Sequence, residues 1–179
     1  MTQVGNVYGQ ALYTLAKDEG FSEVVLEDLQ VLKSCFAAEP NFVRLLAAAN
    51  LSKEERCQVL DNSFRGKIHI YVLNFLKILT EKGYIRHFPE CCDSYEEQYN
   101  LDKGILPVRA VTAVPLSEEQ TGKLTKKLSD MTGKTIKLEK RVDPECIGGV
   151  RLDFDGRRLD NTVAHRLEAI GSLLKNTVL

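Results

Sequence analysis

VDPECIGGVRLDFDG, from Val142 to Gly156, and VTAVPLSEEQ, from Val111 to Gln120, decide the fold of this chain. Both stretches follow Gly104, in a region where strand, turn and helix signals alternate. The residues before Lys103 show almost only helix signals. The period of the apolar residues changes from 3.6 to 2 at this point, so the chain changes architectural class near Gly104.

The part before Gly104 predicts six helices. In the first, apolar residues recur at the spacing of one helix face. These are Val4, Val7, Tyr8, Ala11, Leu12 and Leu15. Ser52 with Glu55 fits a capping box, which marks the start of the fourth helix. The predicted helices span residues 4–20, 21–36, 40–46, from 52 onward, 68–79 and 88–101.

The fifth helix, residues 68–79, is apolar nearly all round. A helix of this kind is expected to be buried on nearly every side. Two interpretations remain open and are compatible: the helix is the centre of a helical bundle, or it also forms one wall of a groove that receives a helix from a partner.

After Gly104 the pattern predicts a small β-α-β-β-α domain. Its strands cover residues 108–114, 136–142 and 150–154, with a helix over 117–131 that opens on a Ser117–Gln120 capping box. Asp155-Gly156 is typical of a tight hairpin turn. The last helix begins at Asp160 or Asn161 and carries Val163, Leu167, Ile170 and Leu174. The predicted class is α+β, with a six-helix bundle over residues 1–105 and the small domain over 106–179.

Composition restricts the function classes. The 179 residues are 44% hydrophobic and 27% charged, which is ordinary for a soluble globular protein. No apolar run approaches the roughly 20 residues that span a bilayer, and the first residues resemble no targeting signal.

The two halves of the chain differ in charge. Residues 1–105 carry 11 Lys+Arg and 15 Asp+Glu, whereas residues 106–179 carry 13 Lys+Arg and 10 Asp+Glu. The basic surplus of residues 106–179 is too small to favour nucleic-acid binding. Because the two halves have opposite net charge, we expect them to meet different partners.

No set of residues predicts an active site, a cofactor site or a metal site. Gly133-Lys134-Thr135 lacks the earlier glycine and the following helix of a phosphate-binding loop, so Gly133 is interpreted as a helix C-cap. The pair Gly148-Gly149 indicates a bulge, or a close approach of a helix to the strand. The five cysteines have no C-x-x-C spacing, and they are expected to be reduced and used as small apolar residues. His69, His87 and His165 fall on three different predicted elements.

Several separate stretches together resemble one known family. They are YGQALYTLA from Tyr8, VTAVPLSEEQ from Val111, GKTIKLEKRVDPECIGGV from Gly133, then Gly156 and residues 160–167. In their order and spacing the chain resembles the delta subunit of F-type ATP synthases, the counterpart of the mitochondrial oligomycin-sensitivity-conferring protein. Gly9, Cys146 and Asn161-Thr162 depart from the family pattern, and Gly9 weakens a helix by about 0.5 to 1 kcal/mol relative to Ala.

The resemblance implies a non-catalytic stator subunit of a rotary ATP synthase. The helical domain would receive an amphipathic N-terminal helix of an alpha subunit of the catalytic head, in a groove between the first and fifth helices. The groove residues would be Tyr8, Ala11, Leu12, Leu15, Tyr71, Phe75 and Leu79. The C-terminal domain would hold the C-terminal part of the b subunits of the peripheral stalk. The residues expected there, as contacts or as fold-defining positions, are Ile147, Gly148, Gly149, Val150, Leu167, Ile170 and Leu174.

The same resemblance implies a peripheral location at the cytoplasmic face of the coupling membrane, with no insertion into the bilayer. Two rival hypotheses come from other classes. One is a small enzyme or regulatory domain that binds an anion through Gly148-Gly149 with Lys134 or Arg151. The other is a helical scaffold for a different complex. Stabilisation by nucleotides or phosphates would favour the enzyme, and stabilisation by an amphipathic helical peptide would favour the adaptor.

Overall fold

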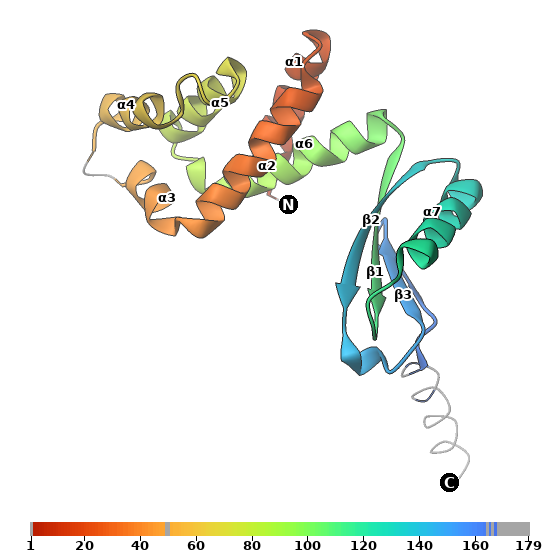
Figure 1. The fold of residues 1–179 in the computed structure, drawn as a ribbon. Helices are drawn as coiled ribbons and strands as arrows, with labels where there is room; N and C mark the ends of the chain where they lie inside the picture. Colours follow the sequence, from red (N-terminus) through yellow and green to blue (C-terminus); the bar gives the residue numbers. More distant parts are fainter. Residues whose placement is uncertain (1, 49–50, 164, 166, 168–179) are drawn as a thin grey trace. The chain divides into compact units, whose positions relative to one another are not determined.

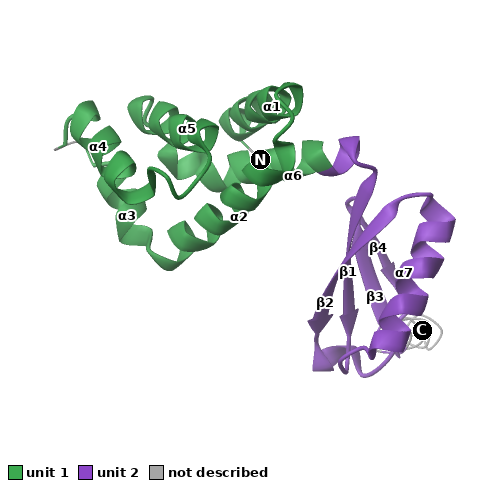
Figure 2. Cartoon of the chain, turned by 45° about the horizontal axis from the view of Figure 1, so that its top comes forward, with its two compact units in different colours: residues 1–99 green, residues 100–179 purple. Residues whose placement is uncertain are grey.

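The computed structural model describes residues 2–48, 51–163, 165 and 167 (Figure 1). The chain divides into two compact units, residues 1–99 and 100–179 (Figure 2). The α+β class is confirmed. The details differ from the expected arrangement, since the described residues form seven α-helices, two short 3-10 helices and a four-stranded sheet.

The first unit is helical. Its elements are α1 (Gln3–Asp18), α2 (Ser22–Ala38), α3 (Pro40–Leu46), α4 (Lys53–Phe64), α5 (Ile70–Glu81), the 3-10 helix η1 (Ile85–His87) and α6 (Phe88–Asp102). The capping box predicted at Ser52 and Glu55 is present and opens α4. The centre of the unit is made by apolar side chains that are almost fully buried. They include Val25, Leu29, Leu32, Leu60, Leu73, Leu76, Ile85, Phe88 and Tyr95.

Two predictions about the helix faces are wrong. The buried side of α1 contains Gly5, Gly9, Leu12, Tyr13 and Ala16, and of these only Leu12 belongs to the predicted apolar stripe. The reason is close packing: a Cβ atom on Gly9 would lie 2.5 Å from the Cys91 carbonyl oxygen of α6. Helix α5 is also not buried all round, because Ile70 and Ile78 are 56% and 46% exposed.

In its described residues, the second unit is a four-stranded sheet with an α-helix packed on it. Its elements are β1 (Ile105–Thr112), α7 (Glu118–Thr132), β2 (Thr135–Val142), the 3-10 helix η2 (Pro144–Cys146), β3 (Val150–Phe154) and β4 (Arg157–Asp160). The strand order is β2-β1-β3-β4, with β1 parallel to β2 and antiparallel to β3. Helix α7 opens on the predicted Ser117–Gln120 box and ends at Gly133, whose φ of 68° is left-handed as a C-cap requires.

Strand β4 was not predicted. Asp155 and Gly156 have φ of 49° and 69°, as a two-residue hairpin turn needs, and the chain after them pairs with β3. The core side chains of the unit alternate along the strands and meet α7 at Leu128. Met131, expected on the buried face of this helix, is 72% exposed because it lies in its last turn.

Candidate functional site

Two helices of the first unit each expose an apolar stripe. On α1, Val7 is 58% and Leu15 is 41% exposed, and Ala11 between them is exposed as well. These positions are four residues apart, so they lie on one side of the helix. On α5, Ile70 and Ile78 are exposed on one side, with the exposed polar Asn74 between them. Exposed apolar side chains in rows of this kind are typical of surfaces that bind another helix.

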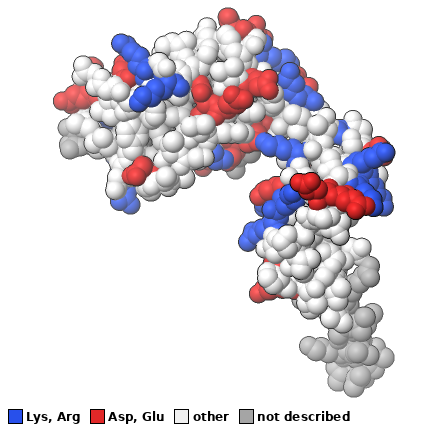
Figure 3. Space-filling model, in the orientation of Figure 1, with Lys and Arg blue, Asp and Glu red and all other residues white. Residues whose placement is uncertain are grey.

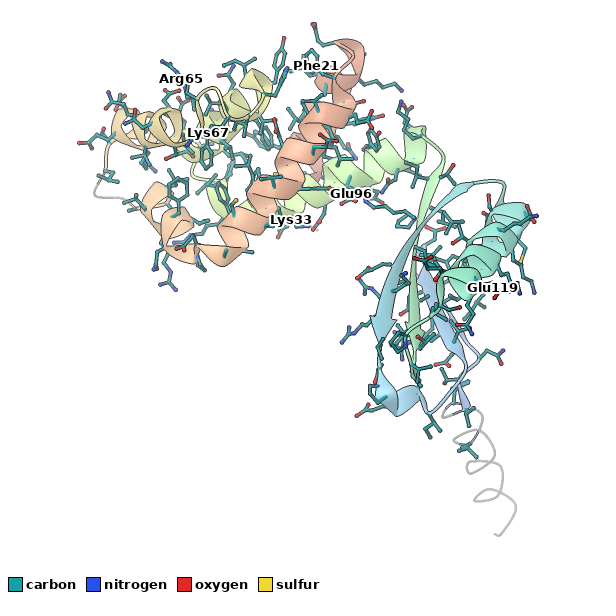
Figure 4. The ribbon with its side chains drawn as sticks, in the orientation of Figure 1. Phe21, Lys33, Arg65, Lys67, Glu96 and Glu119 are labelled. Carbon is teal, nitrogen blue, oxygen red and sulfur yellow. The ribbon has the colours of Figure 1, made fainter. Side chains whose placement is uncertain are left out.

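Aromatic contacts connect the two helices to their surroundings. Tyr8 of α1 lies edge-to-face against Tyr84, directly after α5, with ring centroids 5.9 Å apart. Phe21, which follows α1, stacks on Tyr71 of α5 at 5.1 Å (Figure 4). Aromatic pairs of this geometry stabilise a fold by more than the burial of their apolar area alone. The first half of α1, through Tyr8, and the chain just after α1, through Phe21, therefore contact residues of α5 or its continuation.

Carboxylates from other helices bind the N-cap residues of both helices. Glu90 of α6 accepts hydrogen bonds from the hydroxyl and the backbone N–H of Thr2, the N-cap of α1. Asp28 of α2 accepts from the backbone N–H of His69, the N-cap of α5, at 2.6 Å. The hydrogen bond from the Thr2 hydroxyl is the main cause that lowers the pKa of the Glu90 carboxyl. The carboxylates hold α1 and α5 in place.

The structure separates the predicted groove residues into two groups. Ala11 and Leu15 are exposed and Tyr8 and Tyr71 are half-buried, so these four can meet a partner. Leu12, Phe75 and Leu79 are 5%, 6% and 0% exposed and belong to the core. Sequence reasoning missed Val7, Ile70 and Ile78 as site residues. The signal was present, since all three are apolar positions of the predicted helices, but periodicity does not tell which side a helix buries.

The residues expected at the stalk lie in the second unit. Ile147 is 64% exposed and Leu167 is 55% exposed, whereas Gly148 and Val150 are half-buried. Gly149 has φ of 83°, and a Cβ atom there would lie 2.4 Å from the Asn161 carbonyl oxygen. The glycine lets Asn161 and Thr162 approach the start of β3 closely. The approach of a helix to the strand, which the sequence suggested, stays a prediction. Ile170 and Leu174 lie outside the described residues.

The residues of the rival anion site are not brought together. Lys134 precedes β2, at the end of the sheet where Thr135 donates to Gly104. The Gly148-Gly149 loop lies at the opposite end, before β3. Arg151 lies near that loop, but its guanidinium is 3.7 Å from Asp153. The arrangement therefore gives no support to a phosphate site built from these groups.

The open face of the sheet carries a row of alternating charges. Glu139, Arg109, Asp153 and Arg158 are neighbours across the four strands. Arg109 lies 3.0 Å from Glu139, and Arg158 lies 2.8 Å from Asp153. A hollow of about 610 Å³ lies over this row. Because the charges pair with one another, the hollow presents no unpaired charge from the row to a charged substrate, and Figure 3 shows both signs side by side on this unit.

The Cys91 thiol is not activated for nucleophilic catalysis. Burial raises the pKa of the Cys91 thiol to about 12, which keeps it protonated and unreactive at neutral pH. Within the part of the chain that the structure describes, no group of His, Cys, Asp and Glu could hold a metal ion. In the same residues, no helix combines the length and the apolar character needed to cross a membrane.

Comparisons with known proteins agree with the resemblance seen in the sequence. The family model described as "ATP synthase delta (OSCP) subunit" matches residues 4–174. The chain is 31% identical to "ATP synthase subunit delta" of Alkaliphilus oremlandii, over 98% of each chain. It is also 31% identical to the protein of that name from Desulfitobacterium hafniense strain Y51, over 94% of each. A chain in the Toxoplasma gondii mitochondrial ATP synthase hexamer has the same fold, with a TM-score of 0.74, 22% identity and coverage of 97% of this chain and 98% of that one. The chain thus belongs to the ATP synthase delta (OSCP) subunit family.

Proposed function

We propose that this chain ties the catalytic head of an F-type ATP synthase to the b subunits of its peripheral stalk through two separate surfaces. As a member of the delta family it is a structural component of the peripheral stalk, and catalysis takes place in other subunits. The two finer assignments, an alpha-subunit helix on the first unit and b subunits on the second, are the content of the proposal.

The observation that carries the proposal is the exposed apolar stripe of α1. Gly5 and Gly9 turn one side of the helix toward α6, and Val7, Ala11 and Leu15 are left on the surface. An apolar row on a fixed helix costs free energy in water unless a partner covers it. An amphipathic helix fits such a row, since its own apolar residues recur at the same spacing.

The mechanical role follows from holding two partners at once. When the central stalk turns, the head would turn with it unless a tether resists the torque. Two moderate contacts on one chain raise the effective concentration of each partner at the other site, so the tether is tighter than either contact alone. This role needs no residue of the chain to contact ATP or the transported ion. We also propose that the chain works at the cytoplasmic face of the coupling membrane, peripheral to the membrane-bound complex.

The first test titrates the full chain with a peptide of the alpha-subunit N-terminus from the same organism. Leu15→Asp and Ile78→Asp each place a charge on the proposed face and should weaken binding at least tenfold, because the apolar contact is lost and the charge is desolvated. Val31→Asp is the matched control, since Val31 is 60% exposed but lies on α2.

Phe75, which the sequence places in the groove, is a poor position for such a variant. Phe75 is 6% exposed, so a charge there should unfold the first unit as well as abolish binding. Circular dichroism shows whether the Leu15→Asp and Ile78→Asp variants stay folded. If they are folded and bind the peptide like the Val31→Asp control, the exposed apolar residues of α1 and α5 are not the binding site for the head.

A further inference from the structure

Ile147 has a backbone conformation that its residue type disfavours. Its φ is 62° and its ψ is −43°, and the N–H of Gly148 donates to the Cys146 carbonyl at 2.6 Å. This is a γ-turn of the strained kind, with φ positive. A β-branched residue is a clear outlier at positive φ, because Cβ crowds the backbone.

The surrounding structure holds this turn from both sides. Before it, Asp143 accepts from the Glu145 N–H at 3.1 Å, and Cys146 is buried. After it, the Val163 N–H donates to the Gly148 carbonyl at 3.0 Å. Strained residues persist where neighbours determine their conformation, and they are concentrated at functional sites.

The strain at Ile147 is not offset by burial of its side chain, which is 64% exposed. Glycine would adopt this conformation without strain, so folding alone does not account for isoleucine here. Val114, Val142 and Val163 are 69%, 46% and 40% exposed. They lie at the same end of the sheet, since Thr112 pairs with both Val142 and Val150, and Val163 is bonded to Gly148.

Beside this apolar end lies a small acidic hollow of about 180 Å³. Its wall includes Asp143, Glu145 and Asp160, with Arg151 and His165. A hydrogen bond from the Thr162 hydroxyl lowers the pKa of the Asp160 carboxyl, so this group stays ionised near neutral pH. Three carboxylates against one guanidinium favour a partner that brings a positive charge.

We infer that Ile147 is the anchor residue of the stalk-binding surface, inserting among the apolar side chains of an amphipathic stalk helix whose adjacent Lys or Arg reaches the acidic hollow. This inference rests on the proposed function for the identity of the partner, the b subunit. The γ-turn fixes the backbone of Ile147 before binding, so little backbone entropy is lost when the partner covers the side chain. A preorganised apolar side chain at the centre of a patch is a typical position for a binding hot spot.

The test is a calorimetric titration of the full chain with the soluble part of the b subunit from the same organism. Ile147→Ala removes the side chain beyond Cβ and should raise the Kd at least tenfold. Met131→Ala is the matched control, because Met131 is 72% exposed at the opposite end of the same unit and should leave the Kd unchanged. Glu145→Lys should weaken binding, and the deficit should shrink as salt is added.

A second measurement tests the strain itself. Without strain, glycine at an ordinary position lowers the Tm relative to alanine. At a strained positive φ the order reverses, so Ile147→Gly should have a higher Tm than Ile147→Ala. The γ-turn has no role if the Ile147→Gly chain melts below the Ile147→Ala chain.

The outcomes separate this inference from the proposed function. If the unchanged chain fails to bind the b subunit, the stalk assignment fails and the inference fails with it. If the unchanged chain binds and Ile147→Ala binds equally well, the stalk assignment stands and Ile147 is not the anchor. If Glu145→Lys binds more tightly, the partner brings a negative charge and the charge assignment is wrong.

Discussion

Gly9 shows how packing can reverse an intrinsic preference. Helix propensity predicts that alanine at this position would stabilise α1. In the structure, a Cβ on Gly9 would lie 2.5 Å from the Cys91 carbonyl oxygen and 2.8 Å from the Ser94 Cβ. Gly9→Ala should therefore lower the free energy of unfolding by about 1–3 kcal/mol, because α1 and α6 must move apart. Urea denaturation of the full chain measures this change.

Gly122 is the control for that prediction. It lies within α7, and no atom lies within 4 Å of a Cβ built there. Gly122→Ala should raise the free energy of unfolding by roughly 0.5–1 kcal/mol, because alanine has a higher helix propensity than glycine. Equal effects at the two glycines would mean that α1 and α6 are not in close contact at Gly9.

The same residues explain what the sequence could predict at this scale. Leu12 was expected on the main apolar face of the first helix and is buried, whereas Val7 and Leu15 of the same expected face are exposed. Glycine adds nothing to a hydrophobic pattern, so the close approach at Gly5 and Gly9 has no signal in the periodicity. The candidate face on α1 could be recognised only after the buried side was known.

At the scale of elements, the cap on α1 gives a prediction about pH. The pKa of Glu90 is lowered in the folded chain, chiefly by the Thr2 hydroxyl. Its contribution to stability is full above the pKa of the unfolded chain and is lost as the pH falls through the lower folded pKa. Glu90→Gln should lower the Tm near neutral pH and reduce the loss of Tm on acidification. Melting curves between pH 7 and pH 3 measure both effects, and parallel curves for the two chains would contradict this role.

Local signals located most elements, and contacts distant in sequence determined the rest. The boxes at Ser52 and Ser117 and the cap at Gly133 depend on residues three or four positions apart, and all three were predicted. The hydrogen bond that holds the start of α5 comes from Asp28, which is 41 residues before His69. Strand β4 was missed because Arg157–Asp160 is short and mostly exposed, so it has no alternating pattern. Its strand character comes from pairing with β3.

At the scale of the molecule, the two units predict separable folding. The division at Tyr99 and Asn100 lies inside α6, which continues to Asp102. Tyr99 is 8% exposed and its ring lies 6.5 Å from that of Tyr13, so it belongs to the helical core. A fragment ending at Asp102 should therefore melt cooperatively on its own, and we propose this cut for the domain boundary.

A fragment ending at Gln98 serves as the comparison. It lacks the Tyr99 ring, so its free energy of unfolding should be lower by about 3 kcal/mol. Circular dichroism during heating follows both fragments. If the fragment ending at Asp102 shows no cooperative transition, the first unit needs the sheet in order to fold.

The position of β1 determines how the second unit would carry a pulling force. Only Lys103 and Gly104 separate α6 from β1, and β1 is bonded on both sides, to β2 and β3. The chain enters the sheet at Ile105, whereas Ile147 and its apolar neighbours lie at the far end of the strands. Tension between these two points runs along β1, so the hydrogen bonds of both ladders are loaded in shear, all together. Strands pulled from one shared end would instead peel apart one bond at a time.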